Sequence, residues 1–399
     1  MSGHRPEVAD VIRTYGAEYL EKYGKSTSAE QRRVLRELSN CRTAALGGHK
    51  KKCNLCGHEQ VSYNSCRNRH CPKCQGAARA KWLQARQQEL LEVPYFHVVF
   101  TLPDEIGPLA LQNRRRVYEI LFRAAAESLL TLARDPQHLG ARIGFLLVLH
   151  TWGQNLHLHP HVHGVIPGGG LSLDGRRWVA GRPNFFLPVR ALSRLFRGKF
   201  LSYLQQAFDQ GQLGFHGQLK PLARSVTWKR WRNTLRAKEW VVYAKPPFGG
   251  PVQVLKYLAR YTHRVAISNQ RLLSIEAGRV TFSWKNYAQG NRPSTLVLDA
   301  LEFIRRFLLH VLPRGFVRIR YYGFLANGQR KTKLPLIRAL LGQAQPPPPS
   351  PPTAGDSDAG GEEDAAERCP RCRQGWMIVI EQVPPTTQGA PTPWWTDTS

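Results

Sequence analysis

Paired cysteines near the N-terminus constrain the fold of this chain more than any other feature. In the segment CNLCGHEQVSYNSCRNRHCPKC, Cys53 and Cys56 form one C-x-x-C pair, and Cys71 and Cys74 form another. Each pair holds two thiolates on one tight turn, so two pairs complete a closed tetrahedral zinc site. The spacing therefore predicts a structural zinc ion bound by Cys53, Cys56, Cys71 and Cys74, which supplies folding free energy rather than chemistry.

Four further side chains near these pairs offer ligands for a second zinc ion. Cys66 and His70 lie four residues apart, and Cys41 and His49 precede the first pair. Two thiolates and two imidazoles are a common ligand set for zinc. The alternative is that both cysteines are small core residues and that both histidines contact backbone or phosphate.

The last two of the eight cysteines, Cys369 and Cys372, supply only half of a tetrahedral site unless a histidine or another chain completes it. The N-terminal residues lack an apolar core of signal-peptide length, and no apolar run elsewhere is long enough to span a bilayer. We therefore expect a cytoplasmic protein. In that reducing compartment, paired cysteines indicate zinc rather than disulfides.

The charge of the chain indicates a polyanionic partner. It has 57 Lys and Arg residues against 28 Asp and Glu residues, a formal net charge of +29. Nucleic acid is the expected partner. A membrane is not expected, because no basic amphipathic helix has a continuous apolar face. A generically basic, ribosome-associated protein is the alternative.

Hydrophobic periodicity predicts four regions. A helical segment (1–40) precedes the cysteine-rich zinc-binding domain (41–94), which should recognise DNA. Strands then alternate with helices over 95–345, an α+β pattern. Residues 346–399 form a Pro-rich acidic linker and a tail with the last C-x-x-C pair, and this composition predicts disorder.

The stretch HLHPHVHGVI has histidines at four alternate positions, from His157 to His163. Pro160 lacks the N–H that a sheet ladder needs, so we expect the strand to start just after it. His161 and His163 then share one face and can bind a divalent cation. His157 and His159 are the candidates for a third ligand, and the sequence does not choose between them. The alternative for each histidine is a hydrogen-bonded polar residue without a metal.

Two tyrosines lie 94 and 98 residues beyond His163. Tyr257 and Tyr261 are spaced i to i+4 within PVQVLKYLARYTHRV, so both lie on one face of a predicted helix. A phenol is a useful nucleophile only when a base or a cation activates it, because its pKa is ordinarily about 10. Packing of the two rings is the alternative.

Several motifs taken together resemble a known family. CRTAALGGHKKKCNLCG, YNSCRNRHCPKCQG, HPHVHGVIPGGG, YLARYTHRVAIS, FSWKNY and HVLPRGFVRIRYYGFLA, which span about Cys41 to Gly342, are similar to motifs of rolling-circle insertion-sequence transposases of the HUH class with two catalytic tyrosines. The resemblance implies an HUH endonuclease fold, which is an antiparallel sheet with flanking helices and with the HUH strand at its centre. It also implies that His161 and His163 hold Mg²⁺ or Mn²⁺.

The activity that this resemblance implies is cleavage and joining of single-stranded DNA at element ends and target sites. Tyr257 or Tyr261 would form a 5′-phosphotyrosine link and release a 3′-hydroxyl. A plasmid or phage rolling-circle replication initiator would need the same site. A noncatalytic zinc-dependent DNA-binding regulator is the rival from another class, although it leaves the histidine and tyrosine pairs unexplained. The resemblance also implies a bacterial cytoplasmic protein associated with the nucleoid. The sequence leaves the oligomeric state open.

Overall fold

A five-stranded antiparallel sheet forms the centre of the protein. The computed structural model describes residues 5–248, 254, 265–286, 290, 292–345 and 367–386. The strand order is β13-β5-β6-β3-β9, so the strand that carries His161 and His163 is central, as expected. The strands are β3 (Tyr95–Thr101), β5 (Gly144–Trp152), β6 (Leu158–Pro167), β9 (Val242–Phe248) and β13 (Ile319–Gly323).

Strand β6 starts earlier than predicted. It begins at Leu158 and so includes Pro160. The ladder between β5 and β6 is irregular between His150 and Trp152, where Trp152 pairs with Leu158. On its other side, β6 pairs with β3 only from His161 onward. Pro160 therefore lies where no regular ladder requires its missing N–H.

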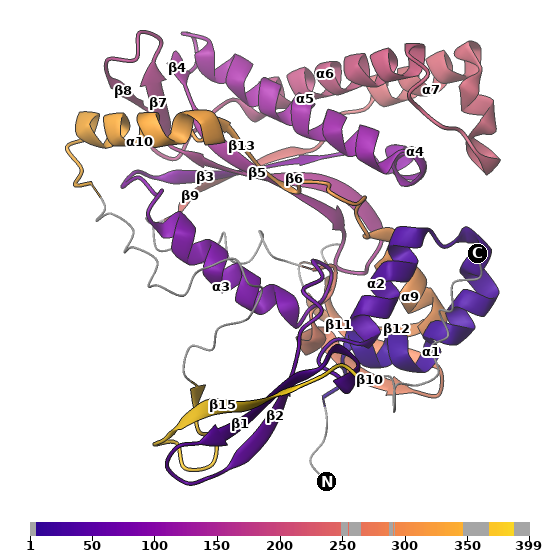
Figure 1. Cartoon of the computed structure of the whole chain (residues 1–399). Coiled ribbons are helices and arrows are strands. Elements are labelled where there is room, and N and C mark those ends of the chain that lie inside the picture. Colours follow the sequence, from indigo (N-terminus) through magenta and orange to yellow (C-terminus); the bar gives the residue numbers. More distant parts are fainter. Residues whose placement is uncertain are drawn as a thin grey trace.

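Helices cover both faces of this sheet (Figure 1). Helices α5 (Arg114–Arg134) and α6 (Val189–Asp209) pack on the face that carries Val162 and Ile166. Val165, whose side chain points the other way, packs with residues of α10 (Asn327–Leu340). Because side chains alternate along a strand, His161 and His163 share this second face with Val165. Trp82 and Leu83 of α3 (Cys74–Gln87) pack against the same cluster.

A second layer of helices and strands lies beside the sheet. Helices α1 (Val8–Tyr23) and α2 (Ala29–Ser39) share a hydrophobic cluster with α9 (Ala300–Leu309). Helix α2 starts at a capping box, because the Ser28 hydroxyl accepts from Gln31 N–H and the Gln31 side chain accepts from Ser28 N–H. The sheet of this layer contains β10 (Leu272–Glu276), β11 (Arg279–Asn286) and β12 (Arg292–Asp299).

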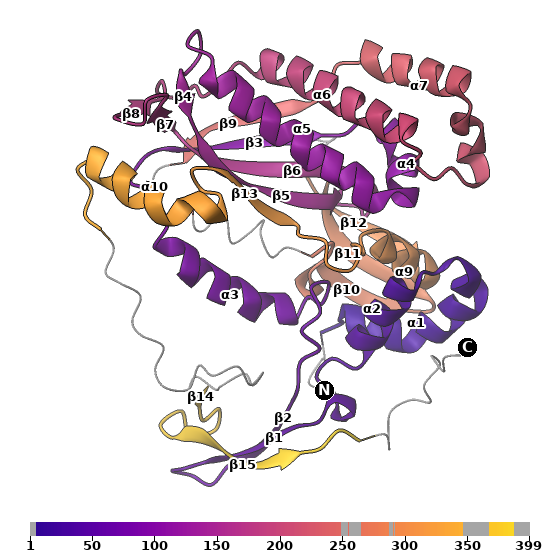
Figure 2. The same ribbon diagram turned by 45° about the horizontal axis from the view of Figure 1, so that its top comes forward.

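A four-stranded sheet combines segments from the two ends of the chain. Its order is β14-β15-β1-β2, with β1 (Gly48–Cys53) and β2 (Glu59–Tyr63) near the N-terminus and β14 (Glu367–Arg368) and β15 (Trp376–Val383) near the C-terminus. Figure 2 shows this sheet projecting from the body of the protein. The disorder expected for 346–399 falls mainly on residues outside the described ones, whereas 367–386 contain two strands.

The remaining elements extend the main body. A three-stranded sheet has the order β4-β7-β8, in which β4 directly precedes β5 in the chain and β7 directly follows β6. Helices α4 and α7 lie beside α5 and α6 (Figure 1). No described helix combines the length and apolar character needed to cross a membrane. These elements are β4 (Ala141–Arg142), β7 (Gly169–Ser172), β8 (Trp178–Ala180), α4 (Gly107–Gln112) and α7 (Ser225–Ala237).

Candidate functional site

Three histidines from two adjacent strands converge on one point. The candidate ligand nitrogens of His150, His161 and His163 all lie within 4.8 Å of one another. The antiparallel register pairs His150 of β5 directly with His161 of β6. Sequence reasoning missed His150, because its only signal was its position at the end of the apolar run IGFLLVLHTW. Among the described residues, His150 is therefore the third candidate ligand, and neither His157 nor His159, the two candidates named from the sequence, belongs to this group.

Hydrogen bonds orient two of these imidazoles. The Nε2 atoms of His161 and His163 are 3.0 Å apart. His161 Nδ1 lies 2.6 Å from the carbonyl oxygen of His159, so Nδ1–H donates to it and the lone pair of Nε2 is left for a cation. His163 Nδ1 lies 2.9 Å from Nε2 of His97 on the neighbouring strand β3. Both contacts turn Nε2 toward the same point, which is how outer-shell groups orient metal ligands.

Burial determines the charge of His97. This side chain is buried, and loss of hydration lowers its pKa to about 3, with smaller contributions from Lys245 and His161. His97 is therefore neutral at physiological pH and can accept the His163 Nδ1–H.

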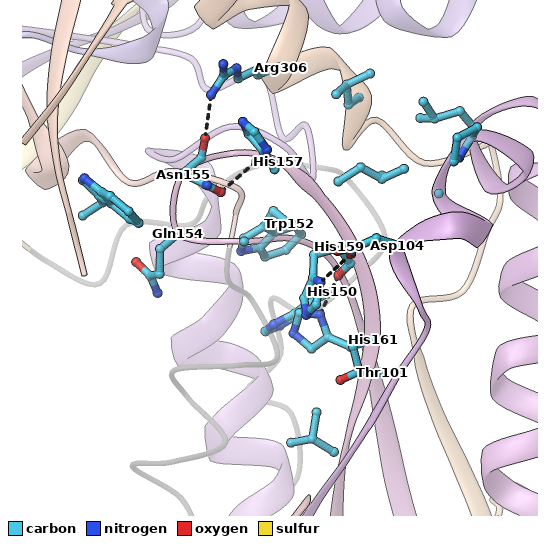
Figure 3. A pocket seen from close by; sticks show the side chains of 18 of the residues that line it. Thr101, Asp104, His150, Trp152, Gln154, Asn155, His157, His159, His161 and Arg306 are labelled. Carbon is cyan, nitrogen blue, oxygen red and sulfur yellow. Dashed lines mark hydrogen bonds and ion pairs between the residues drawn. The ribbon is translucent and has the colours of Figure 1, made fainter. Parts of the chain in front are cut away.

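His157 and His159 lie outside the triad. His159 Nδ1 is 3.7 Å from a carboxylate oxygen of Asp104, which is 89% exposed. The backbone N–H of His157 donates to the Asn155 side chain, and partial burial lowers the pKa of its imidazole. Figure 3 shows these residues along the cavity, with His150 and His161 near one end and Arg306 near the other.

The triad opens into a cavity of about 990 Å³ between the central sheet and α9. At its far end, Glu302 accepts from both Arg305 and Arg306, and hydrogen bonding to Arg305 is the main cause that lowers the Glu302 pKa to about 2. Two guanidinium groups share one carboxylate, so the net charge there is positive. The lining also includes Trp152, Gln154, Asn155 and Trp284.

Tyr257 and Tyr261 lie outside the described residues. Described residues lie on either side of it in the sequence. Val254 is buried in the cluster that contains Val165, on the histidine face of the sheet. Ala266, at the other side of the segment, is buried in the cluster that contains Leu156 of the β5–β6 connection.

The cysteines form two clusters of four, and their grouping differs from the prediction. Cys71 and Cys74 meet Cys41 and Cys66, with sulfur-to-sulfur distances of 3.6 Å from Cys41 to Cys74, from Cys66 to Cys74 and from Cys71 to Cys41. A tetrahedron with bonds of about 2.3 Å separates its sulfurs by about 3.8 Å. This cluster fits a structural zinc ion.

Cys53 and Cys56 join the tail pair, Cys369 and Cys372, instead of Cys71 and Cys74. Strand β15 pairs along the whole of β1 and brings the tail pair to its end, and spacing within the N-terminal segment cannot reveal this contact. The predicted set of Cys53, Cys56, Cys71 and Cys74 was therefore wrong in its partners. Neither His49 nor His70 belongs to either cluster of the described residues.

His70 has a structural position instead. Its Nε2 accepts the backbone N–H of Leu312 at 3.4 Å, and burial lowers its pKa well below the ordinary value. The neighbouring Arg69 donates to the carbonyl oxygen of Phe316. Both contacts join the first cysteine cluster to the HVLPRGF motif, so the mixed set of Cys41, His49, Cys66 and His70 was also wrong.

Two families of known proteins match parts of the chain. Residues 144–333 match a family described as "Putative transposase", and residues 11–102 match a family described as "Transposase zinc-binding domain". The second match contains all of the first cysteine cluster but only half of the other.

Two solved structures are also similar to parts of the chain. One is TrwC in complex with a 27-mer DNA comprising the recognition hairpin and the cleavage site, with 15% identity over 35% of this chain and 71% of the other and a TM-score of 0.21. The other is the conjugative relaxase TrwC with OriT DNA in a metal-free structure, with 13% identity over 63% of this chain and 73% of the other and a TM-score of 0.22. Both scores are too low to carry an argument.

Two relatives that match most of the chain decide the family. The chain is 54% identical to a protein named "Putative transposase y4qJ" from Sinorhizobium fredii over 100% of both chains. It is 31% identical to the transposase for insertion sequence element IS801 of Pseudomonas savastanoi pv. phaseolicola, over 77% of this chain and 73% of that protein. With the histidine triad and the zinc-type cysteine cluster, this similarity over most of both chains confirms the resemblance drawn from the motifs, and the chain belongs to the family of insertion-sequence transposases that includes the IS801 enzyme.

Proposed function

We propose that this transposase nicks and joins single-stranded DNA in rolling-circle transposition, with Tyr257 or Tyr261 as the nucleophile and a divalent cation at His150, His161 and His163. The observation that carries the proposal is the convergence of three imidazoles on one point beside a cavity that Arg305 and Arg306 line. The similarity to two transposases favours this function over that of a plasmid or phage replication initiator.

The separation of the ligand atoms fits a divalent cation. Bonds of about 2.1 Å at right angles place neighbouring ligand atoms about 3.0 Å apart, as the Nε2 atoms of His161 and His163 are. Imidazole nitrogen binds Mn²⁺ more strongly than Mg²⁺, which prefers oxygen ligands. We therefore expect Mn²⁺ to support cleavage at a lower concentration than Mg²⁺. The bound cation would polarise the scissile phosphate and stabilise its added charge.

The reaction requires a phenol close to that phosphate. Val254, three residues before Tyr257, belongs to the cluster that contains Val165 on the histidine face of the sheet, and Ala266 belongs to the cluster that contains Leu156 of the β5–β6 connection. These positions of the two flanking residues support the assignment of the tyrosines. The phenol loses its proton, its oxygen bonds to phosphorus, and the P–O3′ bond breaks as the 3′ oxygen takes up a proton. Attack by another 3′-hydroxyl on the phosphotyrosine then restores the tyrosine and joins the strands. No ATP is needed, because the phosphotyrosine link conserves the free energy of the cleaved phosphodiester bond.

The cavity offers a binding surface for unpaired nucleotides. Trp152 and Trp284 present aromatic rings on which bases can stack, and Arg305 and Arg306 supply positive charge for phosphates. The high net charge of the chain adds affinity that does not depend on DNA sequence.

Covalent trapping tests this function. Single-stranded oligonucleotides from candidate element ends are incubated with the protein and Mn²⁺, and denaturant-resistant adducts are mapped by mass spectrometry. We expect adducts at Tyr257 or Tyr261, and none when both are changed to Phe or when His161 and His163 are both changed to Ala. The exposed Tyr63→Phe variant is the control and should keep its adduct. A normal adduct yield from the double tyrosine variant would refute the nucleophile assignment.

A further inference from the structure

We propose that Cys53, Cys56, Cys369 and Cys372 bind a second structural zinc ion, which clamps the C-terminal segment to the N-terminal zinc-binding domain. The match to a transposase zinc-binding domain ends at residue 102 and so contains only half of these ligands. The proposal is independent of the cleavage chemistry.

The four sulfurs have the arrangement of a zinc site. They lie within 4.8 Å of one another, with Cys53 and Cys372 at 3.7 Å and Cys56 and Cys369 at 3.6 Å. These separations are close to the edge of about 3.8 Å that tetrahedral zinc requires, and they are much longer than the bond of about 2.0 Å in a disulfide. Cys53 and Cys369 are buried, although the sheet around them is largely exposed.

The backbone forms a matching turn at each cysteine pair. Gly57 N–H donates to Cys53 O at 3.2 Å, and Arg373 N–H donates to Cys369 O at 2.8 Å. Gly57 and Arg373, which each follow the second cysteine of a pair, both have positive φ, +69° and +58°. Two pairs that are 313 residues or more apart in sequence thus adopt the same local conformation.

Backbone N–H groups also point at the thiolates. Leu55 and Cys56 each donate to Cys53 Sγ at 3.4 Å, and Gly375 donates to Cys372 Sγ at 3.4 Å. Such donors offset the negative charge of metal-bound thiolates. They make each pair a suitable half of one site.

Close packing holds the tail in the register that the site needs. Strand β15 pairs with β1 from Gly48 opposite Val383 to Cys53 opposite Met377. A Cβ on Gly375 would lie 2.5 Å from Cys53 Sγ and 2.8 Å from Asn54 Oδ1, so only glycine allows this approach. Asn54 also bonds the tail twice, through Asn54 N to Trp376 O at 3.0 Å and Trp376 N to Asn54 Oδ1 at 2.8 Å.

Metal content tests whether the two pairs share one ion. Bound zinc is measured per chain in the purified full-length protein, in the Cys53→Ser/Cys56→Ser variant, in the Cys369→Ser/Cys372→Ser variant and in the combined variant. We expect each double variant to lose one zinc per chain and the combined variant to lose no more. An unchanged zinc content in the Cys369→Ser/Cys372→Ser variant, or a loss of two ions in the combined variant, would overturn the proposal.

A cleavable linker gives a second measurement that does not depend on removing a ligand. A protease site is placed between residues 346 and 366 of the full chain, and the cut protein is passed over a sizing column with zinc or with excess chelator. The tail fragment should remain with the body in zinc and separate in chelator. Gly375→Ala should release it in zinc, whereas Gly328→Ala, whose Cβ would meet no atom within 4 Å, should not. Separation of the wild-type fragment in zinc would also refute the clamp.

Discussion

At the residue scale, the site distinguishes histidines that the sequence presents as equivalents. His161 and His163 alternate with core residues, so strand geometry alone puts them on one face. His150 joins them because the register of β5 places it opposite His161, whereas His157 lies before the paired part of β6 and His159 bonds His161 only through its backbone carbonyl. Within the same alternating stretch, His161 and His163 therefore face the proposed cation, whereas the imidazoles of His157 and His159 do not.

A pair of single substitutions tests this distinction. We expect His150→Ala to weaken Mn²⁺ binding by about 100-fold and to lower cleavage in parallel, because the cation loses a ligand. His157→Ala, the matched control, should stay within about 3-fold of the wild type. Calorimetric titration with Mn²⁺ and gel assays of oligonucleotide cleavage give both values. If His157→Ala weakens binding as much as His150→Ala, the assignment of His150 as the third ligand is incorrect.

At the element scale, the C-terminal end of α9 contacts the β5–β6 hairpin that carries the histidines. His310, at the C-terminal end of α9, lies 3.2 Å from the Thr151 hydroxyl through Nδ1 and 3.1 Å from the Leu156 carbonyl oxygen through Nε2. These contacts hold both ends of the β5–β6 connection, where Leu156 has a φ of +63°. Complete burial lowers the His310 pKa to about 3, so the folded protein keeps this imidazole neutral.

The depressed pKa predicts a loss of stability in acid. The unfolded chain protonates His310 below a pH of about 6.5, whereas the folded chain does so only near pH 3, so the unfolded state binds more protons between these values. The free energy of unfolding should fall as the pH falls through that window.

A variant isolates the contribution of His310. We expect His310→Gln to lose about 2 kcal/mol less than the wild type between pH 7 and pH 5, because the amide does not titrate. Urea denaturation at both pH values measures the difference, with the exposed His216→Gln as control. Equal losses for wild type and His310→Gln would show that this histidine does not contribute.

At the scale of the whole molecule, charge and chain connectivity matter most. The formal net charge of +29 is carried mainly by the body, because 346–399 are acidic overall. The two cysteine clusters connect the N-terminal region to different parts of the protein. The cluster with Cys41 packs in the core around α1 and α9, and the cluster with Cys53 includes cysteines of the tail. The N-terminal region thus contacts both the core around α1 and α9 and the end of the chain.

Salt dependence tests whether charge drives DNA binding. For about six phosphates neutralised on a single strand, the logarithm of the association constant should fall with the logarithm of salt concentration with a slope of about −4. Fluorescence anisotropy of a labelled oligonucleotide in increasing NaCl measures this slope. The Tyr257→Phe/Tyr261→Phe variant keeps its charge and serves as the control with an unchanged slope. Binding that does not respond to salt would contradict the proposed role of the basic surface.

The sequence by itself determined the properties that depend on neighbouring residues. Alternation along β6 placed His161 and His163 on one face, apolar runs located β3 and β5, and composition separated the basic body from the acidic segment. Only the tertiary structure decided which distant groups meet. Strand register brought His150 to the pair, and pairing of β15 with β1 exchanged the partners of Cys53 and Cys56. The physical reason is that C-x-x-C spacing sets the geometry of half a zinc site, whereas the tertiary structure decides which cysteines supply the other half, for Cys56 from 313 positions away.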